Sequence, residues 1–168
     1  MKEYCNRKKI RLNGYDYSKN GYYYITVCTK NRQPLFWKNI VGADIIRPNS
    51  CSKTKYFPEL SEYGKIADTA IKEIPLYYSN VRIDEYVIMP DHLHMILEIS
   101  NDENGRMISA PTTVMTIVGQ MKRWVSKKIG SSIWQKSFYE HIIRNDTDYQ
   151  EIKSYIINNP LYYSFQKE

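Results

Sequence analysis

Residues 82–99, RIDEYVIMPDHLHMILEI, decide the fold. The segments 82–89 and 92–99 are rich in β-branched and apolar residues, which favours strands, and Pro90-Asp91 between them is typical of a turn. Strands joined so closely pair antiparallel. Alternate residues of a strand lie on opposite faces of the sheet, so His92 and His94 share one face. The other face of this strand is apolar and suited to packing under helices: Leu93, Met95, Leu97 and Ile99.

The flanking sequence supplies further elements, each predicted from apolar spacing or β-branched content. We expect a strand over residues 21–29, a helix over 61–74, a helix over 113–129, a strand over 137–143 and a last helix starting near Thr147. Thr147 and Gln150 have the spacing of a capping box, and Pro160 predicts that this helix ends near Asn158.

The order of the first six elements is that of a ferredoxin-like (RRM-like) sandwich, an α+β fold whose sheet is antiparallel. The last helix follows as a C-terminal addition. We expect one face of the sheet to carry helices and the other to remain available for a ligand.

The length of 168 residues fits one domain over 1–168. Within it we expect a basic N-terminal segment over 1–20, a long surface loop over 38–58 and a polar loop over 101–111. The three cysteines are widely spaced and odd in number, which argues against a disulfide framework and a thiolate zinc site. No apolar run approaches the roughly 20 residues of a membrane span. The N-terminus lacks the apolar core of a secretory signal, so we expect a cytoplasmic protein that contacts no membrane.

The net charge of +6 favours polyanionic partners, although many basic proteins bind no nucleic acid. The 16 tyrosines can stack on unpaired bases, but tyrosine is also an ordinary strand residue. In the helix over 113–129 four basic residues fall off the apolar stripe. They form either a solvated face or a DNA-facing edge: Lys122, Arg123, Lys127 and Lys128.

Two short patterns carry possible chemistry. His92 and His94 lie on one face of a strand, a few ångströms apart, where two imidazoles can chelate one cation. Tyr155 and Asn159 lie four residues apart and share a helix face, so the Asn159 carbonyl can be a third ligand beside a tyrosine hydroxyl. Each pattern has a plain alternative. His-x-His pairs also occur by chance, and Tyr155 can simply pack with its apolar neighbours while Asn159 ends the helix.

Five segments together carry a family resemblance: RLNGYDYS (11–18), GYYYITVCTKNR (21–32), MPDHLH (89–94), WQKSFYEHIIR (134–144) and YIINNP (155–160). In this order and spacing the chain resembles the REP-associated tyrosine transposases, relatives of the single-tyrosine HUH transposases of insertion sequences. The resemblance runs along most of the chain.

The resemblance implies that His92 and His94 are metal ligands, that Tyr155 is the nucleophile and that Asn159 is the third ligand, where many relatives have Gln. Histidine with an amide oxygen suits Mg²⁺ or Mn²⁺. The implied activity is metal-dependent nicking and strand transfer of single-stranded DNA at palindromic hairpins, through a covalent 5′-phosphotyrosine. His141 either orients this site or is structural.

The implied partner is single-stranded or hairpin DNA, bound in the cytoplasm at the nucleoid by a monomer or a homodimer. Candidate DNA contacts are the basic residues of the 113–129 helix and of the N-terminal segment: Arg7, Lys8, Lys9 and Arg11. Two other functions remain open. One is a non-catalytic single-stranded nucleic-acid-binding module on the same sandwich, and the other is a metal-dependent hydrolase that uses water instead of Tyr155.

Overall fold

The computed structural model describes residues 14–38, 59–100 and 113–165, with side chains described as far as Pro160. The N-terminal basic residues and the interiors of the 38–58 and 101–111 segments lie outside these ranges. The elements follow one another as β1 (Gly21–Cys28), the 3-10 turn η1 (Lys30–Arg32), α1 (Glu62–Lys72), α2 (Ile74–Tyr77), β2 (Val81–Ile88), β3 (His92–Ile99), α3 (Val114–Ile129), β4 (Tyr139–Ile143) and α4 (Asp146–Phe165). The predicted order is confirmed, with the short helix α2 added.

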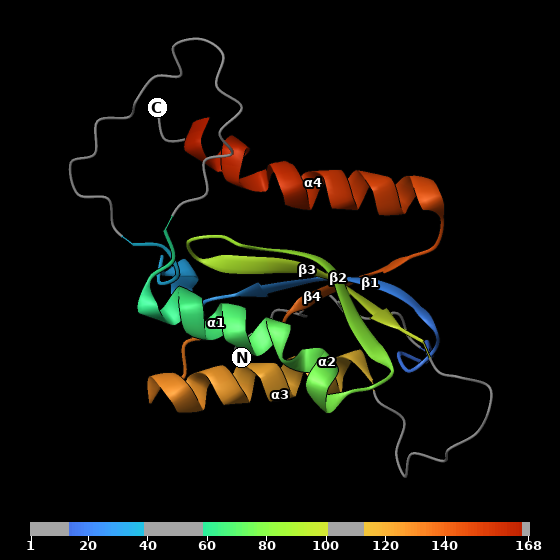
Figure 1. Ribbon diagram of the computed structural model, residues 1–168, viewed down its shortest axis with the longest axis horizontal. Coiled ribbons are helices and arrows are strands. Elements are labelled where there is room, and N and C mark those ends of the chain that lie inside the picture. The colour runs from blue at the N-terminus through green and yellow to red at the C-terminus, as the bar shows by residue number, and fades with distance from the viewer. Residues whose placement is uncertain (1–13, 39–58, 101–112, 166–168) are drawn as a thin grey trace, which may run out of the picture.

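The four strands form one antiparallel sheet in the order β2-β3-β1-β4. Helices α1, α2 and α3 cover one face of this sheet, and α4 crosses the other face (Figure 1). The fold is therefore α+β, as expected. The second face, expected to remain available for a ligand, also carries the C-terminal helix.

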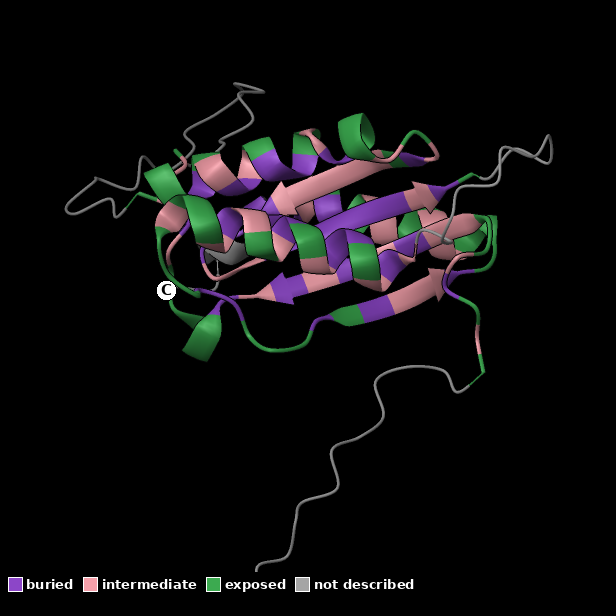
Figure 2. Cartoon of the chain, turned by 90° about the horizontal axis from the view of Figure 1, so that it is seen from below, coloured by how far each residue is buried: buried purple, intermediate pink, exposed green. Residues whose placement is uncertain are grey.

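The main core lies between the sheet and the α1–α3 layer. The apolar face predicted for β3 is buried there, together with the inward residues of β1: Tyr23, Ile25, Val27, Leu93, Met95, Leu97 and Ile99. Figure 2 shows the helices of this layer with their buried stripes turned toward the sheet and their exposed stripes turned outward. Because successive side chains of a strand point to opposite faces, one face of the sheet packs into the core and the histidine-bearing face packs against α4.

Local capping sets where the helices begin. Ser61 Oγ accepts a hydrogen bond from Gly64 N at 3.1 Å, and Thr113 Oγ1 accepts one from Thr116 N at 3.2 Å. In α4 the cap is Asn145, whose Oδ1 accepts from Asp148 N at 2.9 Å. The predicted capping box at Thr147 is therefore wrong, because an asparagine two residues earlier satisfies the first free backbone N–H groups.

The predicted end of α4 near Asn158 is also wrong, since the helix continues through Pro160 to Phe165. Proline lacks an N–H and removes one backbone hydrogen bond. Packing compensates here, because Ile156 on the preceding turn packs against sheet residues and Asn159 is also buried. A continuous helix keeps Tyr155 and Asn159 one turn apart.

The two ends of the 38–58 segment are held together. Trp37 pairs with Leu60 in an isolated β-bridge, and Lys38 N donates to Glu59 O at 2.9 Å. The segment therefore leaves and re-enters the fold at one place. In the described ranges, no helix has the length and apolar character needed to cross a membrane.

Candidate functional site

Three of the predicted site residues, His92, His94 and Tyr155, meet between the sheet and α4. The centroids of the His92 and His94 rings are 4.7 Å apart, with an interplanar angle of 79°. The Tyr155 ring lies edge-to-face with His94, at 5.4 Å and 69°. Residues 61 positions apart in the sequence, His94 on β3 and Tyr155 on α4, are thus in contact within one chain.

His94 is only 5% exposed, and its two ring nitrogens have different surroundings. Nδ1 lies 2.7 Å from Tyr24 Oη and 2.8 Å from Thr26 Oγ1, whereas Nε2 is buried without a hydrogen-bond partner among the described residues. Burial, with smaller contributions from the neighbouring His92 and Arg32, lowers the pKa of His94 to about 3. The ring is therefore neutral and can present a nitrogen lone pair, as a metal ligand must.

His92 is oriented by the residue before it. Its Nδ1 lies 2.6 Å from Asp91 Oδ1, and Arg32 Nε lies 3.4 Å from the other carboxylate oxygen. Burial lowers the pKa of His92, although the hydrogen bond to Asp91 acts against this shift. An imidazole that donates Nδ1–H to a carboxylate has its lone pair on Nε2, the usual arrangement of a metal-binding histidine.

Tyr155 and Asn159 occupy contrasting positions on α4. The Tyr155 side chain is 48% exposed, while Asn159 is 8% exposed and its Nδ2 is buried without a described partner. Buried polar atoms are nearly always hydrogen-bonded, so an unpartnered atom such as His94 Nε2 or Asn159 Nδ2 is a point where a polar ligand can bind. Turning the Asn159 amide by half a rotation presents its oxygen instead.

These donors fit a divalent cation. Among the described residues, no three His, Cys, Asp or Glu side chains gather closely enough to hold a metal ion. A third donor beside the two imidazoles would have to be of another kind, and the amide oxygen of Asn159 is the one predicted from the sequence.

The remaining predicted residues lie elsewhere. His141 Nε2 lies 2.8 Å from Asp148 Oδ2, a contact that joins β4 to the first turn of α4. Arg7, Lys8, Lys9 and Arg11 are outside the described residues. Arg123, Lys127 and Lys128 are exposed on α3, in the layer on the far side of the sheet from the histidine pair.

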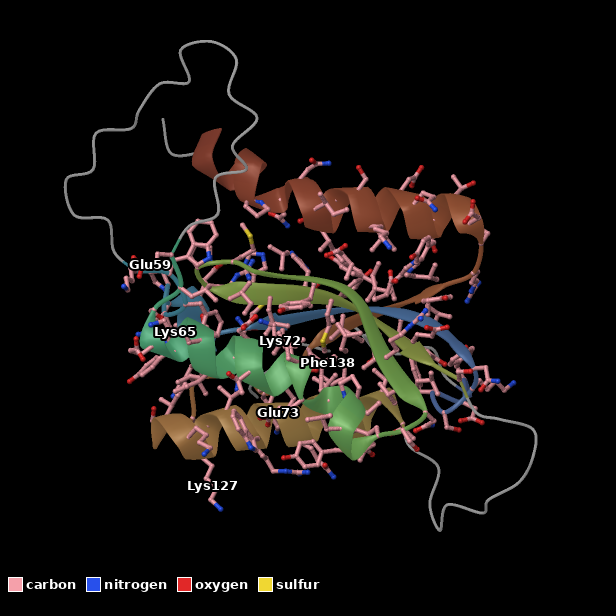
Figure 3. The ribbon with its side chains drawn as sticks, viewed as in Figure 1. Glu59, Lys65, Lys72, Glu73, Lys127 and Phe138 are labelled. Atoms are coloured by element: carbon pink, nitrogen blue, oxygen red, sulfur yellow. The ribbon has the colours of Figure 1, made fainter. Side chains whose placement is uncertain are left out.

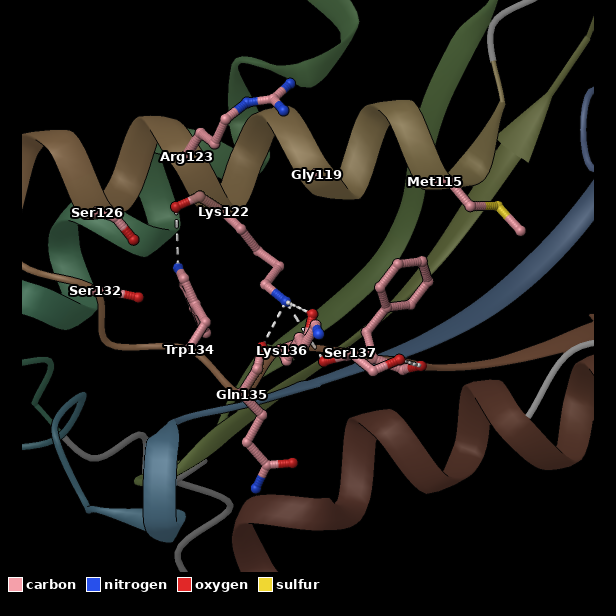
Figure 4. Close-up of a pocket in the computed structure, with 11 residues that line it drawn as sticks. Met115, Gly119, Lys122, Arg123, Ser126, Ser132, Trp134, Gln135, Lys136 and Ser137 are labelled. Carbon is pink, nitrogen blue, oxygen red and sulfur yellow. Dashed lines mark hydrogen bonds between the residues drawn. The ribbon is translucent and has the colours of Figure 1, made fainter. Parts of the chain in front are cut away.

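Lys122 has a structural contact that the sequence did not predict. Its ammonium donates to the carbonyl oxygen of Gln135 at 2.7 Å and, at 3.4 Å, to those of Lys136 and Ser137 (Figure 4). Burial lowers the pKa of Lys122. This lysine therefore ties α3 to the segment that leads into β4, along one wall of a surface groove of about 530 Å³.

Sequence reasoning missed the residues that hold the two imidazoles. Tyr24 and Thr26 alternate along β1, and the register pairs Thr26 directly with His94. Alternation alone would have placed both hydroxyls on one face of β1, but nothing in the sequence says that this strand lies beside β3. Asp91 directly precedes His92 and could have been identified as its partner.

The chain was compared with known proteins. It is 33% identical to an uncharacterized Haemophilus influenzae protein, over 93% of this chain and 89% of the relative. It is 23% identical to a second protein of that organism, whose name marks it as a candidate REP-associated tyrosine transposase, over 89% of this chain and 76% of the relative. No protein-family model matches the chain.

Among solved structures, a REP-associated tyrosine transposase bound to a REP hairpin has a similar fold. Its TM-score is 0.59 at 22% identity, with 91% of this chain and 74% of that chain covered. In sequence and in its α+β fold, the chain is therefore similar to the REP-associated tyrosine transposases.

Proposed function

We propose that this protein nicks and rejoins single-stranded DNA through Tyr155, with a divalent cation held by His92, His94 and Asn159. The observation that carries the proposal is the edge-to-face contact of Tyr155 with His94, at 5.4 Å within one chain. A phenol beside a neutral, buried imidazole with a free nitrogen is the arrangement that a metal-assisted tyrosine nucleophile needs. The strand order also supports a ferredoxin-like (RRM-like) sandwich as the scaffold.

His92 Nε2, His94 Nε2 and the Asn159 amide oxygen would hold Mg²⁺ or Mn²⁺. When bound, such a cation withdraws charge from a phosphate oxygen and orients the leaving oxygen of the scissile bond. The protein's own contribution is to bury both imidazoles, which favours their neutral forms, and to orient them through Asp91 on one side and two β1 hydroxyls on the other.

In the proposed step, Tyr155 Oη attacks the phosphorus and loses its proton to solvent, while the departing 3′ oxygen takes one up. The bond from phosphorus to the 3′ oxygen breaks, that oxygen leaves as a 3′-OH, and a 5′-phosphotyrosine remains. A free tyrosine has a pKa of about 10, so its phenolate lies about 4 kcal/mol uphill at pH 7. The covalent ester conserves the bond energy, so attack by a second 3′-OH reseals a strand without ATP.

The substrate we propose is single-stranded DNA next to a hairpin. The structurally similar transposase was solved with a REP hairpin, which supports a hairpin ligand for this chain. The exposed position of Tyr155 suits a strand that enters from outside, because a buried hydroxyl could not reach a polymer backbone. The positive net charge favours the phosphate contacts that hold such a strand.

The test is to incubate the protein with hairpin-bearing single-stranded DNA and Mn²⁺ and to look for an adduct that survives denaturation. We expect the adduct with the wild type and with Tyr77→Phe, an exposed tyrosine on the far helical layer. Tyr155→Phe should remove the adduct and the nick together, because the step then lacks its nucleophile.

Two other outcomes would contradict the proposal. A nick that persists in Tyr155→Phe would show that water is the nucleophile, as in a metal-dependent hydrolase. DNA binding without any nick, at every Mn²⁺ or Mg²⁺ concentration, would show the non-catalytic binding module.

A further inference from the structure

Two hydroxyl groups of β1 converge on one nitrogen of His94. Tyr24 Oη and Thr26 Oγ1 lie 2.7 Å and 2.8 Å from Nδ1. The Tyr24 ring also stacks on the imidazole, with centroids 5.4 Å apart and an interplanar angle of 20°. The hydroxyls limit where the ring points, and the stacking limits its tilt.

The neutral His94 ring has two tautomers, which differ in whether Nδ1 or Nε2 carries the proton. With the proton on Nδ1, the ring donates to a hydroxyl oxygen, and Nε2 presents a lone pair. With the proton on Nε2, that N–H is a buried donor without a partner among the described residues, and with the proton on Nδ1 the same atom is a buried acceptor without one. The two forms differ at Nδ1, where an N–H can be shared between both hydroxyl oxygens, which favours the Nδ1–H form. A hydroxyl can accept as well as donate, so Tyr24 and Thr26 are compatible with the favoured form.

We propose that Tyr24 and Thr26 are positioning residues that hold His94 in its Nδ1–H tautomer and direct the Nε2 lone pair toward the cation site. Asp91 has the corresponding role for His92, but with a carboxylate. The cation belongs to the proposed function on which this inference rests, whereas the tautomer is a property of the folded chain alone.

Tyr24 and Tyr155 therefore have different roles in this inference, although both rings contact His94. The Tyr24 hydroxyl is engaged with Nδ1, and burial raises its pKa to about 12. Tyr155 is the exposed phenol of the two. The structure gives one tyrosine the task of orienting the imidazole and leaves the other free to react.

The test is long-range ¹H–¹⁵N NMR of the histidine rings without any metal. The chain has only three histidines, so the His94 signals can be assigned by difference from His94→Gln. We expect the Nδ1–H form in the wild type and its replacement or averaging in the Tyr24→Phe/Thr26→Val double variant. Thr26→Ser keeps a hydroxyl and should keep the Nδ1–H form.

Tyr139→Phe is the matched control. Tyr139 is half-exposed and its ring meets the edge of Tyr24, at 6.3 Å and 72°, but it is not bonded to His94. Mn²⁺ affinity, titrated by electron paramagnetic resonance, should fall about 10- to 100-fold in the double variant and stay unchanged in this control. If the double variant does not fold, the two single substitutions give the same comparison.

An Nε2–H signal for His94 in the wild type would overturn the inference, as would an Nδ1–H form that survives in the double variant. A different result bears on the proposed function alone. If the tautomer behaves as expected but no phosphotyrosine adduct forms in the wild type, the positioning role stands and the nicking activity fails.

Discussion

His94 is a polar side chain that is almost fully buried. One nitrogen has two hydroxyl neighbours and the other has no described partner, so the folded chain bears part of the cost of burying it. The same applies to the amide nitrogen of Asn159. A cation bound at this place would give the unsatisfied His94 Nε2 a partner, so binding and folding should be linked.

We therefore expect Mn²⁺ to raise the melting temperature. At a free concentration about 100 times the dissociation constant, the gain in unfolding free energy is about 2.7 kcal/mol. For a chain of this size that gain corresponds to roughly 5–10 °C. Scanning calorimetry with Mn²⁺, and again after chelation with EDTA, measures it.

His94→Ala should lose the Mn²⁺ shift, because the chelating pair is broken. His141→Ala should keep it, since His141 is bonded to Asp148 and lies outside the proposed ligand set. An equal shift in wild type and His94→Ala would place the cation elsewhere.

Helix α4 is attached to the sheet by a small apolar cluster and by one polar cluster. Ile156 packs with Ile96 and Ile143. At the far edge Asp84 accepts hydrogen bonds from Tyr149 Oη at 2.7 Å and from Lys153 Nζ at 3.1 Å. Asp84 lies where the register of β2 against β3 shifts, and such a bulge re-aims a side chain, here toward α4. Two separate contacts therefore hold the helix that carries Tyr155.

Asp84→Asn should destabilise the protein by about 1.5–3 kcal/mol at pH 7, the usual value of hydrogen bonds to a charged group. Burial acts to raise the pKa of Asp84, but the hydrogen bonds from Tyr149 and Lys153 outweigh it, so the pKa lies below its ordinary value of 3.8. A carboxyl with a lowered pKa stabilises the fold above its unfolded pKa and loses this effect as the pH falls through the folded pKa.

The difference between wild type and Asp84→Asn should therefore be constant above about pH 5 and disappear in acid. Urea unfolding at a series of pH values measures it. Glu151→Gln, an exposed acid on the same helix, should show no comparable loss. A gap between wild type and Asp84→Asn that widens in acid would show that the carboxylate is not the stabilising form.

At the scale of the whole molecule, the reactive groups and the basic helix lie on opposite sides of the sheet. Tyr155 is on α4, and His92 and His94 lie on the sheet face that α4 crosses. Lys127 and Lys128 are exposed on α3, and Lys127 extends away from the sheet (Figure 3). Lysines on α1 differ from these two. Lys65 and Lys72 form ion pairs with Glu62 and Asp68, at 2.8 Å and 2.7 Å. A DNA ligand that touches both sides must pass around an edge of the sheet.

If α3 contacts the DNA, Lys127→Gln/Lys128→Gln should weaken binding uniformly across sequences. The slope of log K against log salt should become shallower by roughly 0.7–0.9 for each lost phosphate contact. Fluorescence anisotropy with a labelled hairpin across a salt series measures this slope. The matched Lys65→Gln/Lys72→Gln variant should keep the wild-type slope, and an equal effect of both pairs would show only a response to net charge.

The sequence by itself determined the strands, the order of the elements and the pairing of functional residues within each element. Alternation along β3 sufficed to place His92 and His94 together and to assign the opposite face to the core. Helical spacing sufficed to place Tyr155 one turn from Asn159. These are local periodicities, and any chain with this pattern has them.

Only the tertiary structure decided how these elements meet. Pro160 predicted a helix end that packing overrode, and Asn145 rather than Thr147 caps the helix. Nothing local to β3 or α4 indicates that the helix folds over the histidine face, or that hydroxyls from β1 reach His94. Those contacts join residues far apart in the chain, and their free energy comes from burying the two surfaces against each other, which no single segment encodes.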